Sequence, residues 1–184
     1  MSSDSLREEL AGIARERRAV VSLRDRVAEL FVESRSDVYR YLLTIGLYPP
    51  QAQETTQEVF LRLYATLRKG EEIRDCRAWI FRVAHNLGLK IRARQNAQVP
   101  FDPDLEQQLA TAAPDAEHSL IERERLLQFH HAVEGLSEQQ RRCLHLRLEG
   151  LRYPEIGSIL GISASAVGEF LRRAIVRLKK VNHG

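Results

Sequence analysis

Cysteine is scarce in this sequence, and long apolar runs are missing. Cys76 and Cys143 lie far apart in the chain, and neither stands in a CxxC or Cys/His spacing that would hold a metal ion. Isolated cysteines of this kind are typical of buried, reduced thiols in the cytosol. No stretch approaches the roughly 18 apolar residues of a membrane-spanning helix. The opening MSSDSLREELAG has charges where a signal peptide is apolar. We expect a cytoplasmic protein with no membrane insertion and no metal or other cofactor.

The motifs of catalytic sites are also missing. The sequence has no glycine-rich phosphate-binding loop, no Ser/His/Asp arrangement and no carboxylate pair suited to acid–base chemistry. Glu54 and Glu58 share a helix face, but no histidine stands at the spacing that a di-metal site requires. His130 and His131 are adjacent and point to different faces of a helix. The sequence therefore predicts a protein that is not an enzyme.

The alternation of polar and apolar residues that marks a strand is absent too, whereas apolar residues recur at helical spacing. We predict an all-α protein of two small helical domains. The predicted helices end at Gly46, run from Pro50 to Gly70, begin near Trp79, and cover 120–133, 138–149, 153–160 and 164–180. Gly88 is unfavourable within a straight third helix. Trp79 is interpreted as a core side chain.

The positive charge of the chain is unevenly distributed. A net charge of +3 is too small to indicate a nucleic-acid partner by itself. However, residues 71–95 carry six basic and three acidic side chains, and residues 125–184 carry ten and five. Between them, residues 96–124 carry one basic and seven acidic side chains. This pattern suggests a polyanionic partner for the two basic stretches, although solvated helix faces would explain the same charges.

Proline and acidic residues mark a linker, VPFDPDLEQQLATAAPDAE, where helical periodicity fades. The predicted organisation is an N-terminal extension (1–22), a first domain (23–95), an acidic linker (96–119) and a second domain (120–184). The extension has a helical apolar pattern. It is interpreted as a solvated segment, with a docking surface for a regulator as the alternative.

The second domain contains a helix-turn-helix pattern. Ser137 and Gln140 form the signature of a capping box, and Gly161 makes a turn before Ser163, which can cap the last helix. Apolar residues would fix the angle between the two final helices and leave the outer face of the last one free for a major groove. These apolar residues are Ile156, Leu160, Ile162, Val167 and Leu171.

Two longer stretches resemble a known family. The run LSEQQRRCLHLRLEGLRYPEIGSILGISASAVGEFLRRAIVRLKK is similar to the fourth conserved region of bacterial sigma factors. The runs DVYRYLLTIGL, QETTQEVFLRLYATL and RAWIFRVAHNLGLKIRAR are similar to the second region. Both regions in this order, joined by a short acidic linker, resemble the extracytoplasmic-function (ECF) group.

The resemblance implies a dissociable RNA polymerase subunit that melts the −10 promoter element and binds the −35 element. Its partners would be the clamp of core RNA polymerase, promoter DNA and an anti-sigma factor. The residues implied for polymerase binding are Glu54, Gln57, Glu58 and Arg62. Those implied for the −10 strand are Arg77, Arg82, His85, Asn86, Lys90, Arg92 and Arg94, with the loop 70–77 holding an unstacked base. Those implied for the −35 duplex are Ser163, Ser165, Ala166, Gly168, Glu169, Arg172, Arg173 and Arg177.

Several positions depart from the family pattern. Ala166, Gly168 and Phe170 replace longer polar residues of the recognition helix, and Lys90 replaces a common aspartate. These departures put the promoter sequence in doubt rather than the class of activity. Two alternatives remain: a stand-alone helix-turn-helix regulator, and a sigma-like interaction protein. A plain regulator has no need of the N-terminal QETTQEVF and RAWIFRVAHN motifs.

Overall fold

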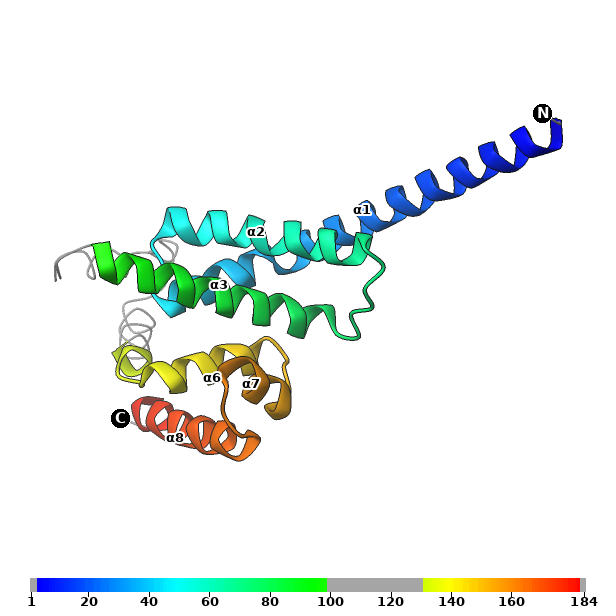
Figure 1. The fold of residues 1–184 in the computed structure, drawn as a ribbon. Coiled ribbons are helices and arrows are strands. Elements are labelled where there is room, and N and C mark those ends of the chain that lie inside the picture. The colour runs from blue at the N-terminus through cyan, green and yellow to red at the C-terminus, as the bar shows by residue number, and fades with distance from the viewer. Residues whose placement is uncertain (1–2, 99–130, 183–184) are drawn as a thin grey trace, which may run out of the picture.

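Three helices form the first helical unit, and each packs against the other two (Figure 1). The computed structural model describes residues 3–98 and 131–182. Helix α1 spans Ser3–Ile45, α2 spans Pro49–Arg68 and α3 spans Cys76–Gln98. The predicted extension is thus part of the same continuous helix as the first domain. Helix α3 continues past the predicted start of the linker at residue 96, and the side chain of Gln95 is hydrogen-bonded to Gln51 on α2.

The core of the first unit is made by apolar side chains that recur at helical spacing. Fully buried members come from all three helices: Val38, Leu42, Ile45, Val59, Leu63, Ile80 and Phe81. Trp79 is partly buried against this core, as predicted. Helix α3 continues through Gly88 without a break. A β-carbon at this position would lie only 3.0 Å from Leu42 and 3.1 Å from Ile45 on α1. The glycine instead permits close packing of α3 against α1.

The second helical unit contains α6 (Glu138–Leu148), α7 (Tyr153–Leu160) and α8 (Ala164–Asn182). The predicted capping box is present: the Ser137 hydroxyl accepts a hydrogen bond from the Gln140 backbone at 3.2 Å, and the Gln140 side chain accepts one from the Ser137 backbone at 2.9 Å. The predicted helix 120–133 lies almost wholly outside the described residues. Val167 and Leu171 on α8 are buried against Ile156 on α7, which fixes the two helices as expected for a helix-turn-helix.

The turn between α7 and α8 depends on two glycines. Gly161 ends α7 in the left-handed conformation, with φ 69°, which glycine adopts without steric cost. At Gly157 a β-carbon would lie 2.6 Å from the carbonyl oxygen of Ile162. The backbone of the turn therefore approaches α7 more closely than any other residue at 157 would allow.

The described part of the chain contains helices, turns and loops but no strand, which confirms the all-α prediction. In residues 3–98 and 131–182, no helix is both long and apolar enough to cross a bilayer. The buried side chains of the two units belong to one hydrophobic cluster, because α1 packs against α6 and α3 against α7.

Candidate nucleic-acid interface

Helix α3 presents its predicted −10 residues on two different faces. Asn86, Lys90 and Arg94 are exposed, and Arg94 lines a groove between α3 and α2 with Glu54 and Glu58. The other four lie on the face of α3 that meets α6 and α7: Arg77, Arg82, His85 and Arg92. The structure therefore brings the seven residues onto one helix, where His85 is buried, Arg77 and Arg92 are partly exposed and the other four are exposed. The loop before α3 ends at Asp75, whose carboxylate accepts a hydrogen bond from the Ala78 backbone at 2.9 Å.

The guanidinium group of Arg77 bridges the two units. It donates to the main-chain oxygen of Glu149 at 2.7 Å and also bonds the Glu149 carboxylate. On its other side it reaches Asp37 on α1 at 3.3 Å. Burial and the charge of Asp37 raise the pKa of the Glu149 carboxyl. Arg77 therefore holds together two carboxylates that would otherwise repel each other.

Two more arginines of α3 bond the second unit. Arg82 donates to the Ser158 hydroxyl on α7 at 2.9 Å. Arg92 forms a two-pronged ion pair with Glu138 at the start of α6, with distances of 3.1 and 2.7 Å. This hydrogen bond holds the pKa of Glu138 below its usual range. Three of the four arginines that the resemblance assigned to the −10 strand thus bond groups of the second unit.

His85 is buried, with an exposed fraction of 4%, and Nδ1 lies 2.9 Å from the hydroxyl of the fully buried Tyr41. This differs from the expectation that His85 faces the −10 strand. Its position is set by packing, because the ring of Tyr41 also contacts the ring of His145 of α6, with the centroids 5.3 Å apart and the planes tilted by 48°. Burial, and secondarily the charge of Arg142, lowers the pKa of His85 to about 4. Burial lowers the pKa of His145 to about 4 as well.

On the polar face of helix α8, a glutamate and two arginines of the same helix are hydrogen-bonded to one another. The Ser163 hydroxyl accepts a hydrogen bond from the Ala166 backbone at 3.1 Å and so caps the helix, as predicted. Glu169 accepts two hydrogen bonds from Arg172, at 2.9 and 2.8 Å, and one from Arg173, at 2.7 Å. These bonds lower the pKa of Glu169 to about 2. Glu169 thus remains ionised, and its charge is offset by two arginines that stay largely exposed.

The remaining predicted −35 residues surround this network. Ser165 and Arg177 are exposed, whereas Ala166 and Gly168 are partly covered. A β-carbon at Gly168 would lie 3.4 Å from the ring of Tyr153, a residue that the sequence analysis did not single out. Tyr153 is 42% exposed, and the guanidinium of Arg147 lies over its ring at 5.8 Å. In the sequence, the one sign that Tyr153 lies at this surface was the presence of an aromatic residue at the first position of the first helix of the helix-turn-helix.

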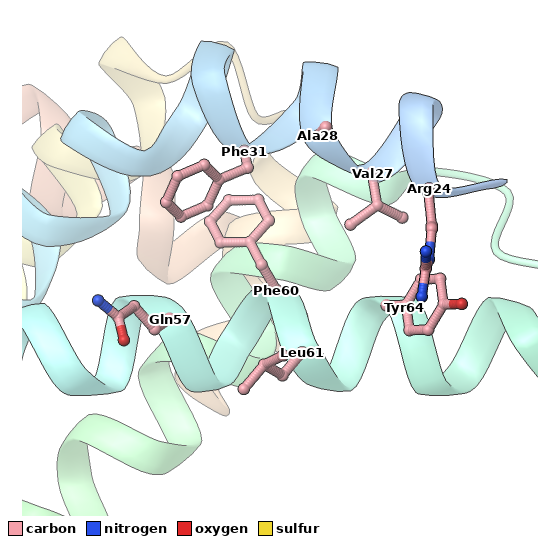
Figure 2. A pocket seen from close by; sticks show the side chains of 8 residues that line it. All are labelled: Arg24, Val27, Ala28, Phe31, Gln57, Phe60, Leu61 and Tyr64. Carbon is pink, nitrogen blue, oxygen red and sulfur yellow. The ribbon is translucent and has the colours of Figure 1, made fainter. Parts of the chain in front are cut away.

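The predicted polymerase-binding residues lie on the solvent-facing part of α2, where Glu54 and Glu58 line a groove against α3. Glu54, Gln57 and Arg62 are exposed, and Glu58 pairs with Arg62 at 2.7 Å. Gln57 also lines a groove of about 440 Å³ between α1 and α2. Figure 2 shows the rings of Phe31 and Phe60 facing each other in this groove, in an edge-to-face contact with centroids 5.1 Å apart.

The same groove exposes apolar surface that the sequence analysis missed. Leu61 on α2 lies beside it with an exposed fraction of 64% (Figure 2). Leu61 follows directly after a buried core position, so helical periodicity gave no reason to place it in the core. An exposed leucine next to Gln57 and Glu58 is a feature of protein-binding surfaces. In the described ranges, no three His, Cys, Asp or Glu side chains gather closely enough to hold a metal ion.

Comparison with known proteins agrees with this arrangement. The sequence matches the family descriptions "Sigma-70 region 2" over residues 30–98 and "Sigma-70, region 4" over residues 126–178. It is 27% identical over 154 residues to the ECF RNA polymerase sigma factor SigM of Bacillus subtilis (strain 168). The aligned part covers 83% of this chain and 93% of SigM.

Two solved structures share the fold. One is the sigma factor RpoE in complex with the anti-sigma factor NepR from Bartonella quintana, with a TM-score of 0.61, 18% identity, and 85% of this chain and 96% of that one covered. The other is CnrH in complex with the cytosolic domain of CnrY, with a TM-score of 0.58, 19% identity, and 91% and 94% covered. The order of regions 2 and 4, the all-α fold and the SigM relative together identify the chain. It belongs to the sigma-70 family, as a sigma factor of the ECF type.

Proposed function

We propose that this sigma factor binds core RNA polymerase through α2, melts the −10 element with α3 and binds the −35 duplex with α8. The observation that carries the proposal is the pairing of an exposed polar and apolar surface on α2 with basic faces on α3 and α8 in one chain. A melted strand needs cationic groups along its phosphates and polar groups at its bases, which Asn86, Lys90 and Arg94 supply on the open face of α3.

On α8, the small residues Ala166 and Gly168 allow the helix backbone to approach a base edge, and alanine can contact a thymine methyl group. Arg172, Arg173 and Arg177 contact phosphates and position the helix. Reading of the −35 element therefore relies on DNA shape and phosphate contacts more than on long side chains.

The proposal extends to partners and location. The two fold relatives were solved with NepR, an anti-sigma factor, and with the cytosolic domain of CnrY. By analogy, we infer an anti-sigma partner for this chain. A protein that acts on polymerase and promoter DNA works in the cytoplasm, and the chemistry of RNA synthesis belongs to the polymerase. The chain itself is then a transcription factor without catalytic activity of its own.

Run-off transcription tests the proposal directly. The purified protein is added to core polymerase on sheared genomic fragments, and transcripts are mapped to their 5′ ends. We expect transcripts that start at a shared sequence and depend on the protein, together with co-purification of core polymerase. Absence of both would reject the function as a sigma factor, whereas duplex binding without polymerase binding would favour a stand-alone regulator.

A further inference from the structure

An aromatic ring lies beside α8 at a position where that helix has no side chain of its own. Tyr153 is the first residue of α7, and a β-carbon at Gly168 on α8 would lie 3.4 Å from Cε2 of its ring. Gly168 stands between the buried side of α8, which includes Val167 and Leu171, and the exposed Arg172. The ring therefore borders the outer face of α8, near the N-terminal turns that contact base edges in a helix-turn-helix.

Other contacts fix the position of this ring. The guanidinium group of Arg147 lies over the ring of Tyr153, 5.8 Å from its centroid, and donates a hydrogen bond to the main-chain oxygen of Leu151 at 3.1 Å. The start of α7 is fixed as well, because the Glu155 carboxylate accepts a hydrogen bond from the backbone of Arg152 at 2.7 Å. A tyrosine side chain has only two rotatable bonds, so a ring that is already positioned can contact a ligand at a small entropic cost.

The ring is also available to a ligand. The exposed fraction of Tyr153 is 42%, whereas Ile156, one turn further along α7, is fully buried. The neighbouring positions of α8 carry only small residues, Ala164, Ala166 and Gly168, so no long side chain of that helix competes for the same space. In the major groove, apolar and aromatic side chains recognise the methyl group of thymine, which no other DNA base carries. Tyr153 has the chemistry and the exposure for this contact.

We propose that Tyr153 determines specificity at the −35 element, because its ring contacts the methyl group of a thymine beside Gly168. This inference rests on the proposed binding of the −35 duplex by α8. It adds that the first helix of the helix-turn-helix supplies a base contact in the place of a side chain at position 168. The small residues of α8 are then part of the reading surface, since the absence of a β-carbon at Gly168 lets the ring lie close to the helix.

Removal of single methyl groups from the DNA tests this contact. The full-length protein is assembled with core polymerase, and active promoters are selected from a library with a randomised −35 segment. Each thymine of the selected segment is then replaced in turn by deoxyuridine, which lacks only the methyl group. Run-off transcription at limiting polymerase compares the wild type with Tyr153→Phe, Tyr153→Ala and Leu148→Ala. Leu148→Ala is the matched control, because it shortens an apolar side chain of the same unit that is 76% exposed.

We expect deoxyuridine at one position to lower the wild-type rate about two- to fourfold, the effect of burying one methyl group. Tyr153→Phe and Leu148→Ala should keep this effect, because both retain the ring. Tyr153→Ala should lose it at that position alone, and a new selection with this variant should no longer prefer thymine there. If no methyl effect depends on the residue at position 153, the proposal is wrong.

Two other results would also overturn the proposal. If Tyr153→Phe loses as much activity as Tyr153→Ala on every sequence, the hydroxyl group contacts a phosphate, and such a contact carries no sequence information. If Tyr153→Ala lowers transcription from all promoters by one factor and keeps every methyl effect, the residue has only a structural role. Circular dichroism verifies that each variant is folded.

The same assay separates this inference from the function on which it rests. Absence of any transcript that depends on the wild-type protein would reject the function as a sigma factor, and the role of Tyr153 with it. Protein-dependent transcripts whose responses to deoxyuridine are the same in the wild type and in Tyr153→Ala would reject the role of Tyr153 alone.

Discussion

On α8, the carboxylate of Glu169 accepts hydrogen bonds from Arg172 and Arg173, two side chains that the sequence assigned to the −35 element. The family resemblance implied only that Glu169 contacts the −35 duplex. The geometry adds another role, because the carboxylate holds both guanidinium groups in place. A side chain that pre-orders two phosphate contacts favours one docking geometry on the duplex.

We predict that Glu169→Gln increases overall affinity for duplex DNA and reduces discrimination between sequences. Removal of the negative charge frees the two arginines, so the slope of log affinity against log salt should become steeper by about 1. Competition binding with promoter fragments at several salt concentrations measures both effects. Glu134→Gln, an exposed acid on the same unit, is the control. An unchanged slope would show that Glu169 does not restrain the arginines.

The arginines themselves provide a second prediction at this scale. Changing Arg172 and Arg173 to Ala should weaken duplex binding about equally for all sequences and flatten the salt dependence, because phosphate contacts carry little sequence information. Titration of fragments with and without a −35 element measures the effect. A loss confined to one sequence would instead indicate that these side chains contact bases.

Gly157 gives a prediction about stability. In Gly157→Ala the added methyl group meets the Ile162 carbonyl at 2.6 Å, and the backbone of the turn must shift. We expect a loss of about 1–3 kcal/mol in the free energy of unfolding. Gly168→Ala is the matched control, because its methyl group meets the Tyr153 ring at an ordinary 3.4 Å and alanine favours the helix. Urea denaturation compares the two, and similar values would contradict this reading of the turn.

At the scale of the elements, local signals predicted the second unit well. Ser137 with Gln140, and Gly161 before Ser163, are short-range patterns that fixed the ends of α6, α7 and α8. Gly88 was harder to interpret, because its helix cost is offset by tight packing against Leu42 and Ile45, which only the fold reveals. At Gly88, tertiary packing therefore outweighs the low helix propensity of glycine.

The candidate site was predicted less completely than the fold. Asn86, Lys90 and Arg94, which the resemblance assigned to the −10 strand, are exposed, but helical spacing could not foresee where Arg92 and Arg77 would point. Their partners stand 46 and 72 positions away in the sequence, and no local pattern links residues at such distances. The assignments to polymerase and DNA therefore stay predictions until binding is measured.

Helix α2 carries a prediction of its own. Leu61 is 64% exposed beside the Phe31–Phe60 groove and adjoins the predicted polymerase-binding residues. Leu61→Arg should reduce co-purification of core polymerase about tenfold or more, with the melting temperature almost unchanged because no buried contact is lost. Val32→Arg, on α1 and 70% exposed, is the control and should keep polymerase binding. Equal losses in both variants would remove the groove from the interface.

At the scale of the whole molecule, two buried imidazoles lie where the units meet. Burial lowers the pKa of both His85 and His145 from 6.5 to about 4. On His145 the charge of Arg40 acts in the same direction and Asp37 opposes it, whereas Arg142 further lowers the pKa of His85. The packed form therefore binds fewer protons than a form in which these rings are in water. Its stability is fully present above about pH 6.5 and falls as the pH drops towards 4, by up to about 1.4 kcal/mol per unit for each ring.

We predict that acidification from pH 7.5 to 5 separates the units before either unfolds, because only the packed form keeps both imidazoles neutral. The radius of gyration should rise over this range while the helical circular dichroism signal is retained. His145→Gln cannot be protonated and should shift the transition to lower pH. His131→Gln, whose parent side chain is 80% exposed, should behave as the wild type does. Carboxylates also titrate near pH 4 to 5, so the comparison of the two variants isolates the histidine contribution, and identical curves for them would show that the contact between the units does not depend on the charge of His145.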